Sequence, residues 1–275
     1  MTLKQQTIAV IGAGNIGRAL IGGLLRGGHV EANAIRATRR NRSMLKQMWS
    51  LFPGIHLLTD NIVAVENASL VVVAVKPQNG LRVFSEIGSH LSSDALIVSV
   101  LAGLTTDVIA KIMPSPHPVV RTMPNTPILV DEGATAIAGG RHAGPEHVEI
   151  VREMFKSVGS VEIVPEHLMD AVTGLSGSGP AYVYMLIEAL TDAGVKQGLP
   201  RPTAFRLAAQ TVVGASRLVV QTRKHPAILR DEVTTPGGTA IAAIAELEAH
   251  GLRTMFINAV ATATKRSREL SEVGV

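Results

Sequence analysis

A run of hydroxyl, proline and glycine residues has the composition expected of a binding site for a carboxylate. Residues 231–239 read DEVTTPGGT and stand directly before an alanine-rich segment that is predicted to be helical. Backbone N–H groups at a helix N-terminus attract anions, and glycine lets a ligand approach the backbone without meeting a Cβ atom. We therefore predict that a substrate carboxylate is bound by Thr235, Gly237, Gly238 and Thr239.

A glycine motif more than two hundred positions upstream is typical of dinucleotide binding. The pattern GxGxxG begins at Gly12, between a strand-like run and a helical stretch that extends roughly to Arg26. Its glycines permit a tight turn, let a pyrophosphate approach, and let the helix pack closely on the strand. The alternative is a glycine turn with only a structural role. The residues predicted to hold the pyrophosphate are Gly12, Gly14, Asn15, Ile16 and Gly17.

The end of the second predicted strand favours NADPH over NADH. An NAD site usually places Asp or Glu about 20 residues past the glycine motif, but here the residues are Ala37, Thr38, Arg39 and Arg40. A carboxylate would repel a 2′-phosphate, whereas a hydroxyl and guanidinium groups bind it through charge-assisted hydrogen bonds. We predict NADP as the cofactor, with NADPH preferred over NADH. The alternative is that Arg39 and Arg40 form an ordinary solvated face.

Other polar residues follow predicted strands at the same edge of the sheet. Asn61 comes just after the third strand and Lys76 at the end of the fourth. Ligands of open α/β sheets bind at this carboxyl edge, so both are predicted to contact the adenosine half of the cofactor. Asn125 and Thr126, in a proline-flanked loop, are predicted to form a wall for the nicotinamide carboxamide. A surface cation at Lys76 and a plain rigid turn at Asn125 are the alternatives.

The elements predicted to position these residues form two domains. Short β-branched runs alternate with helical stretches in residues 1–164, which is typical of a parallel sheet covered by helices. Residues 165–275 lack strand patterns and are apolar on several helix faces, which favours a helical dimerisation domain. The predicted strands are 7–11, 34–38, 55–58, 70–75, 95–100, 119–123, 133–138 and 161–164. The helices predicted after them are 165–175, 180–196, 202–223, 239–250 and 252–270.

Composition excludes several classes of protein. The chain has no cysteine, which excludes disulfides, thiolate catalysis and Cys-based metal sites and favours a reducing compartment. Its histidines lack the spacing of metal ligands, so no metal is expected. There is no secretory signal pattern and no apolar run of the ~18 to 20 residues that a membrane helix needs, so we expect a cytoplasmic protein without a membrane partner. A basic cluster between Arg36 and Lys46 has no interleaved aromatic residues, and we expect no nucleic-acid partner.

Five motifs, in order, resemble the pyrroline-5-carboxylate reductase family: GAGNIG, AVKPQ, RTMPNTP, LSGSGPAY and DEVTTPGGT. The resemblance covers nearly the whole chain, and the combination of GSGPAY with TTPGGT is highly specific. It implies an N-terminal Rossmann-like parallel-sheet domain followed by an all-helical dimerisation domain. It also implies an oxidoreductase that uses NAD(P)H to reduce 1-pyrroline-5-carboxylate to L-proline, the last step of proline biosynthesis. The resemblance further implies a homodimer, and often a larger ring of dimers.

The resemblance carries over to single residues. It implies that the three motif glycines hold the pyrophosphate, that Thr38, Arg39 and Asn61 lie near the adenosine, and that Lys76, Asn125 and Thr126 line the cofactor site. It further implies that a partner's helices complete the substrate site at residues 235–239. This chain departs from the family at Ala240, where many members carry a hydroxyl attributed with bonding the imine nitrogen. Thr239 or a water is the candidate replacement, and no obligate acid or base side chain is predicted.

Two other functions remain open at this stage. Reductases of the β-hydroxyacid dehydrogenase or imine reductase type share the glycine motif but usually rely on a lysine or aspartate from the long interdomain helix. Here the start of that helix offers only Tyr182 and Tyr184 as proton donors. A non-catalytic NADP(H) sensor would have no need for the TTPGGT loop. Reduction of a cyclic imine needs no strong protein acid, because alignment of the reactants alone can supply roughly 7 to 11 kcal/mol.

Overall fold

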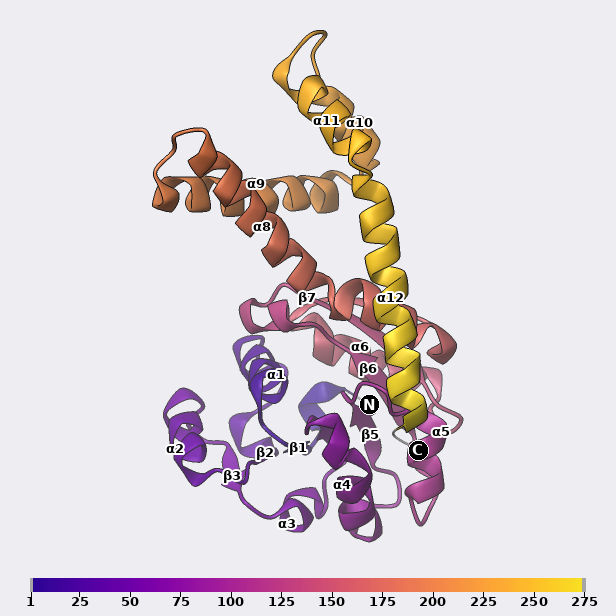
Figure 1. The fold of residues 1–275 in the computed structure, drawn as a ribbon. Helices are drawn as coiled ribbons and strands as arrows, with labels where there is room; N and C mark the ends of the chain where they lie inside the picture. The colour runs from indigo at the N-terminus through magenta and orange to yellow at the C-terminus, as the bar shows by residue number, and fades with distance from the viewer. Residues whose placement is uncertain (1, 274–275) are drawn as a thin grey trace. The chain divides into compact units, whose positions relative to one another are not determined.

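The structure, a computed structural model, describes residues 2–273. It contains an eight-stranded sheet in the order β3-β2-β1-β4-β5-β6-β7-β8 (Figure 1). The strands are β1 Ile8–Ile11, β2 Ile35–Thr38, β3 His56–Leu58, β4 Leu70–Val73, β5 Leu96–Ser99, β6 Val119–Met123, β7 Gly133–Gly139 and β8 Gly159–Ile163. All eight predicted strands are present, with ends that differ by at most two residues.

Helices connect and follow the strands. The sheet is interleaved with α1 Asn15–Arg26, α2 Arg42–Leu51, α3 Asn61–Val65, α4 Gly80–Ile87, α5 Thr106–Ile112 and α6 Pro145–Lys156. After β8 come α7 Met169–Val172, α8 Gly179–Lys196, α9 Arg201–Thr222, α10 Pro226–Glu232, α11 Thr239–Ala249 and α12 Leu252–Val273. The alternation of strands and helices, followed by helices alone, confirms the predicted fold class.

The sheet is parallel except at one pair, because β7 runs antiparallel to β6. The connection from Met123 to Gly133 contains only a 3-10 turn, Thr126–Val130. It is too short for the crossover helix that a parallel neighbour would need. The chain then passes through α6 and returns as β8, which is parallel to β7.

Two expectations about the helices need correction. The predicted helix 165–175 is a 3-10 turn, Glu166–Leu168, then α7, then a π-helical turn, Thr173–Gly177. The helix α10 was not predicted; it begins with a proline, Pro226, directly after its N-cap His225. That proline has the fixed φ angle of a helix start, so α10 carries a normal start signal in a short segment.

Apolar side chains pack against both faces of the sheet. Every residue of β1, β4 and β5 is buried. Leu20 of α1 and Phe155 of α6 are fully buried in the cluster on one face, and Phe84 of α4 is fully buried in the cluster on the other. Burial of each such side chain contributes about 1.5–3 kcal/mol relative to exposure, so the helices are held firmly on the sheet.

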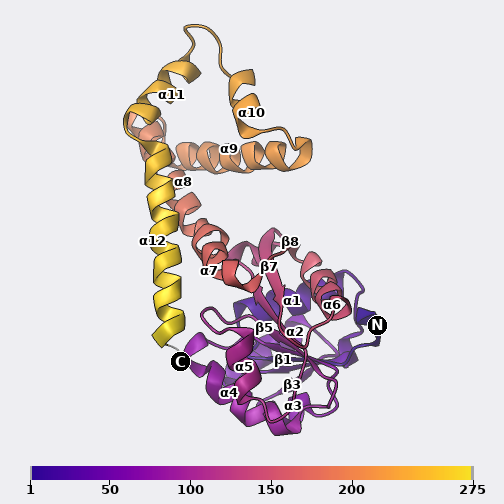
Figure 2. The same cartoon turned by 90° about the vertical axis from the view of Figure 1, so that its right-hand side faces the viewer.

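The chain divides into two compact units. One contains the residues up to Ser178 together with the end of α12 from Ala261, and the other is Gly179–Val260. In the second unit α8 and α9 pack against each other (Figure 2). The predicted domain boundary after residue 164 remains a prediction. No helix among the described residues has both the length and the apolar character needed to cross a bilayer.

Candidate functional site

The glycine motif forms a tight turn between β1 and α1. Gly12 has a φ of +88°, and a Cβ atom there would lie 2.6 Å from Cγ1 of Val75, so the position requires glycine. A Cβ on Gly17 would lie 3.0 Å from Cγ1 of Val10, which shows how closely α1 approaches β1. Gly14 is the N-cap of α1 and makes no side-chain capping bond. The first-turn amides of α1, including those of Asn15 and Ile16, therefore point to a site that suits a pyrophosphate.

Thr38 and Asn61 join this loop in one hydrogen-bond chain. The buried Oγ1 of Thr38 accepts from the backbone N–H of Gly12 at 3.2 Å and donates to Oδ1 of Asn61 at 2.8 Å. Asn61 Nδ2 in turn donates to Oε1 of Glu86 in α4 at 3.1 Å. Because the hydroxyl hydrogen of Thr38 is already donated to Asn61, the side chain of Thr38 orients the site rather than donating to a ligand.

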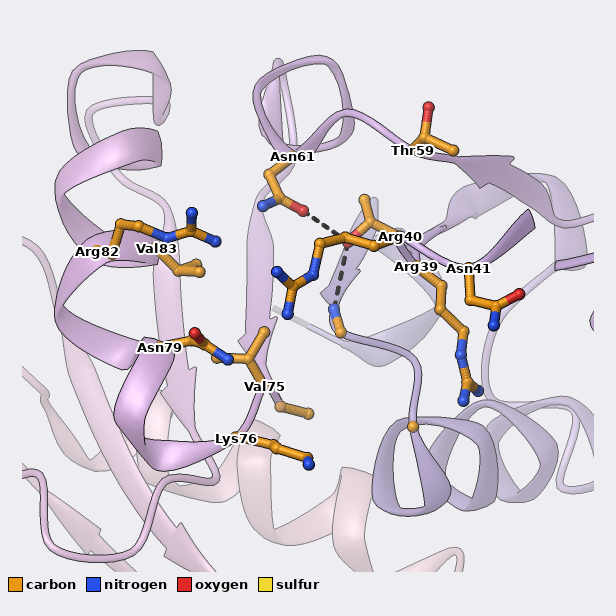
Figure 3. Close-up of a pocket in the computed structure, with 14 residues that line it drawn as sticks. Arg39, Arg40, Asn41, Thr59, Asn61, Val75, Lys76, Asn79, Arg82 and Val83 are labelled. Atoms are coloured by element: carbon orange, nitrogen blue, oxygen red, sulfur yellow. Dashed lines mark hydrogen bonds between the residues drawn. The ribbon is translucent and has the colours of Figure 1, made fainter. Parts of the chain in front are cut away.

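A cavity of about 290 Å³ lies beside this chain of bonds (Figure 3). Four cationic side chains line it, and no carboxylate stands among its described lining residues. Arg39 differs from the other cations because its Nη1 donates to the backbone oxygen of Ala13 at 2.9 Å. The lining residues are Gly12, Gly14, Thr38, Arg39, Arg40, Asn41, Thr59, Asn61, Ala74, Val75, Lys76, Asn79, Arg82 and Val83.

Sequence reasoning missed Asn79 and Arg82 of this cavity. They lie in the turn and the helix directly after Lys76, and the only signal available was their closeness in sequence to that residue. The structure brings them together with Thr38 and Asn61, which come from other strand ends. The cavity can hold a polar anionic group between β2, β4 and α4.

Asn125 connects two loops at the carboxyl end of β6. Its Oδ1 accepts from the backbone N–H of Ala134 at 2.9 Å, and its Nδ2 donates to the backbone oxygen of Ser176 at 3.1 Å. Ser176 belongs to the π-helical turn, so Asn125 fixes that turn against the β6–β7 connection. Thr126 begins the 3-10 turn of the same connection. Neither Asn125 nor Thr126 lines the cationic cavity.

A second and larger cavity, about 730 Å³, lies at the carboxyl ends of β4 and β5. Its walls come from the turn after β4, the loop after β5, the π-helical turn and the end of α12. Ser267 of α12 donates to Oδ1 of Asp170 at 2.6 Å, which holds α12 against α7. The lining residues are Pro77, Gln78, Leu81, Ala102, Gly103, Leu104, Thr173, Ser178, Ala263, Arg266, Ser267 and Leu270. Lys76 of the first cavity and Pro77 of the second are adjacent in one turn.

The predicted substrate loop forms a tight turn before α11, in the second compact unit. Gly237 has a φ of +68°, and the amide of Gly238 donates to the backbone oxygen of Thr235 at 2.9 Å. Gly238 is the N-cap of α11 and makes no side-chain capping bond. A Cβ atom on Gly238 would collide with Oγ1 of Thr235. Since the first-turn amides of α11 are unpaired and the side chain of Thr239 is exposed, this turn suits a carboxylate.

A buried ionic cluster supports the approach to the π-helical turn. Arg121 in β6, with a side chain only 5% exposed, lies 3.4 Å from Oε1 of Glu166. The two carboxylate oxygens of Glu166 accept from the backbone N–H and the hydroxyl of Thr106, at 2.8 and 2.5 Å. The cluster thus ties the start of α5 and the end of β6 to the segment that leads to α7.

The pKa of one buried histidine is shifted, and the described residues offer no candidate metal site. Burial lowers the pKa of His117 below its ordinary value of 6.5, against weaker opposing effects of Ala95 and Asp94. Within residues 2–273, no cluster of three His, Asp or Glu side chains has the arrangement of a metal site.

Comparison with known proteins matches both halves of the chain. Residues 7–103 match the family model described as NADP oxidoreductase coenzyme F420-dependent, and residues 166–270 match the model for pyrroline-5-carboxylate reductase dimerisation. A pyrroline-5-carboxylate reductase from Methanosarcina acetivorans is 42% identical to this chain over 98% of its length and 100% of the relative's.

Solved structures agree along the whole chain. The structure of a pyrroline-5-carboxylate reductase from Coxiella burnetii has a TM-score of 0.91 and 37% identity, and covers 96% of this chain and 98% of that one. A pyrroline carboxylate reductase of Plasmodium falciparum, crystallised with NADP bound, has a TM-score of 0.85 and 28% identity, with coverage of 98% and 99%. The glycine motif, the TTPGGT turn and the full-length similarity together show that this chain belongs to the pyrroline-5-carboxylate reductase family.

Proposed function

We propose that the chain reduces 1-pyrroline-5-carboxylate to L-proline with NADPH, the last step of proline biosynthesis. The observation that supports this function is the presence of two glycine turns at helix starts without side-chain caps, at Gly12–Gly14 and at Gly237–Gly238, in a chain similar to reductases of this name along 98% of its length. The first turn suits a pyrophosphate and the second a carboxylate. The enzyme is an oxidoreductase without a metal in its proposed mechanism.

The residues around the glycine motif fit a nicotinamide dinucleotide. The space that a Cβ atom would fill at Gly12, and the unpaired amides that follow Gly14, suit the pyrophosphate. Asn61 and Lys76 would contact the adenosine half, while Thr38 and Arg39 hold the loop in shape. When bound, the nicotinamide supplies a hydride at its C4 atom. We propose that the ring enters the larger cavity, with Asn125 fixing the turn of Ser176 beside it.

The proposed reaction requires the protein to bind and orient the imine. Hydride adds to the imine carbon, the C=N double bond becomes a C–N single bond, and the nitrogen carries a proton in the product. Because the imine is protonated near neutral pH, the chain has to hold its carboxylate and keep water away. The amides at the start of α11 would bind the carboxylate, each interaction contributing about 0.3–1 kcal/mol when exposed and up to ~2 when partly buried. Thr235 adds a hydroxyl, and Thr239 offers one that can reach the imine nitrogen.

NADPH is the preferred cofactor in this proposal. The cavity between β2 and α4 carries Arg39, Arg40, Lys76 and Arg82, and its lining residues include no carboxylate that would repel a 2′-phosphate. The absence of cysteine supports a reducing compartment, and we propose the cytoplasm.

A homodimer is the proposed working unit, and dimers can assemble into rings. Several large apolar side chains of α8 and α9 are exposed, among them Tyr184, Met185, Phe205 and Leu207. Burial of these faces against a second copy would remove an unfavourable surface. We propose that the substrate turn of one copy serves the cofactor domain of the other.

Complementation tests this cross-dimer site. A Gly238→Val chain keeps its cofactor loop, and a Gly12→Val chain keeps its substrate turn. If the site is shared between copies, unfolding and refolding the two inactive chains together restores about a quarter of wild-type activity, since half of the dimers are mixed and each holds one intact site. If each site lies within one chain, the mixture stays inactive.

The Gly238→Val chain also tests the function itself. The new side chain collides with Thr235 and disturbs the carboxylate turn, but the glycine motif is untouched. We expect imine-dependent turnover to be lost while NADPH still binds, as measured by its fluorescence. Ala249→Val, at the other end of α11, is the matched control. Retained turnover in Gly238→Val would contradict the assignment of this turn to the substrate.

A further inference from the structure

The cations of the smaller cavity fall into two groups. Arg39 is already used, because its guanidinium donates to the backbone oxygen of Ala13. The side chains of Arg40, Lys76 and Arg82 are exposed, and none has an ion-pair or hydrogen-bond partner among the residues that the structure describes; of the three, Arg40 and Arg82 carry guanidinium groups. They come from different elements, because Arg40 follows β2 and Arg82 lies in the first turn of α4.

The two unpaired guanidinium groups extend toward the same space. Figure 3 shows Arg40 and Arg82 reaching from opposite sides of the cavity, with Asn61 near both. Asn61 is held in place by Thr38 on one side and by Glu86 on the other. Hydrogen bonds therefore hold in place the amide of Asn61, which lines the cavity together with the two arginines.

The charges of this space are unbalanced. Two like charges that face one cavity repel each other, and an anion placed between them removes that cost. The nearest carboxylate on α4, that of Glu86, accepts from Asn61 and makes no ion pair with Arg82 in the described part of the chain. A guanidinium group can bind a phosphate through two parallel charge-assisted hydrogen bonds, so two arginines that line one cavity suit a phosphate group.

We propose that Arg40 and Arg82 together select a 2′-phosphorylated adenosine, and so NADPH over NADH, whereas Arg39 positions the glycine loop. The inference rests on the proposed use of a nicotinamide dinucleotide. It assigns the choice between NADPH and NADH to a pair of residues, one of which, Arg82, lies in α4 and not after β2. The bond from Arg39 to Ala13 fixes the backbone between Gly12 and Gly14, which concerns every dinucleotide equally.

Binding of cofactor fragments tests the proposal without turnover. Calorimetry would compare adenosine 2′,5′-diphosphate with adenosine 5′-monophosphate on the wild-type chain and on Arg40→Gln, Arg82→Gln and Arg39→Gln. We expect Arg40→Gln and Arg82→Gln each to raise the Kd of the diphosphate roughly tenfold or more, and to raise that of the monophosphate far less. Arg39→Gln should raise the Kd of both fragments by similar factors. Arg152→Gln, at a half-buried arginine of α6 that pairs with Glu149 and does not line the cavity, is the control.

Turnover supplies an independent measurement. The ratio of kcat/KM for NADPH to that for NADH should fall roughly tenfold or more in Arg82→Gln. The proposed pair would be overturned if Arg40→Gln and Arg82→Gln lost as much affinity for the monophosphate as for the diphosphate. It would also be overturned if they lost no more affinity than Arg152→Gln. Thermal unfolding of each variant separates a lost contact from a damaged fold. If the diphosphate depends on Arg40 and Arg82 but no imine is reduced, the reductase function fails while this inference stands.

Discussion

The hydroxyl of Thr38 is the link between the second strand and the glycine loop: its Oγ1 accepts the backbone N–H of Gly12 at 3.2 Å. The same hydroxyl donates to Asn61, so one buried atom aligns the end of β2, the glycine loop and the start of α3. An interior hydrogen bond of this kind costs more to lose than its net contribution suggests, because both partners are left unpaired.

Replacing Thr38 should therefore affect cofactor binding and stability together. In Thr38→Val the Gly12 N–H and the Asn61 amide lose their partner, and we expect unfolding free energy to fall by about 1–3 kcal/mol. The KM for NADPH should rise for the same reason. Urea denaturation and initial-rate kinetics measure the two effects. Thr38→Ser keeps the hydroxyl and should lie close to wild type; a Thr38→Val enzyme that matched Thr38→Ser would refute this role.

We expect Thr239 to supply the hydroxyl that contacts the reacting imine, since position 240 is alanine. Thr239→Val keeps the shape of the side chain and removes the hydroxyl oxygen that would accept from the protonated imine nitrogen, so we expect kcat to fall roughly tenfold or more, as for loss of a hydrogen bond to a charged group. NADPH binding should not change, because the residue lies in the turn that we propose for the substrate and not in the glycine loop. Thr239→Ser should recover most of the rate. If Thr239→Val turns over like wild type, a water takes this role instead.

Glu166 should matter for stability rather than for chemistry. Its carboxylate satisfies the backbone N–H and hydroxyl of Thr106 and faces the buried Arg121. Glu166→Ala leaves a buried cation without its partner, and we expect a loss of roughly 2 to 4 kcal/mol in unfolding free energy. Denaturant titration measures it. Glu162→Ala, an exposed acid of β8, is the comparison, and equal losses in the two variants would contradict the role of the cluster.

His117 makes stability depend on pH in a defined direction. Burial lowers the pKa of His117 in the folded chain below 6.5, so the folded state takes up this proton less readily than the unfolded state. The contribution of His117 to stability is therefore fully present above pH 6.5 and is lost as the pH drops below that value. Thermal unfolding between pH 5 and 8 should show a smaller acid loss in His117→Gln than in wild type. The exposed His90→Gln is the control, and an identical profile for all three chains would disprove the effect.

The strands were predictable because the apolar runs are short, β-branched and buried on both faces, as in β1 and β4. The direction of β7 was not, since it depends on the length of the turn after Met123 rather than on a residue pattern. The helix α10 was missed because seven residues between two longer helices give too little periodicity.

The site was likewise predictable only in part. Gly12 and Gly238 could be recognised in the sequence from their motifs, and in the structure a Cβ atom at either position would collide with a neighbour. Which of two adjacent arginines is hydrogen-bonded to the backbone does not follow from the sequence. Both Arg39 and Arg40 line the cavity, but the guanidinium of Arg39 donates to Ala13, and Arg40 has no partner among the described residues. Arg82 reaches the cavity only through the packing of α4 on the sheet, which no local pattern encodes.

The most direct test of the reductase function is NADPH oxidation, followed by absorbance, with racemic 1-pyrroline-5-carboxylate and an imine-free blank. Parallel reactions with NADH rank the two cofactors, and product analysis counts proline against NADPH consumed. The account predicts fast imine-dependent oxidation, one proline for each NADPH, and a slower reaction with NADH. NADPH that binds but is not oxidised in the presence of the imine would contradict it.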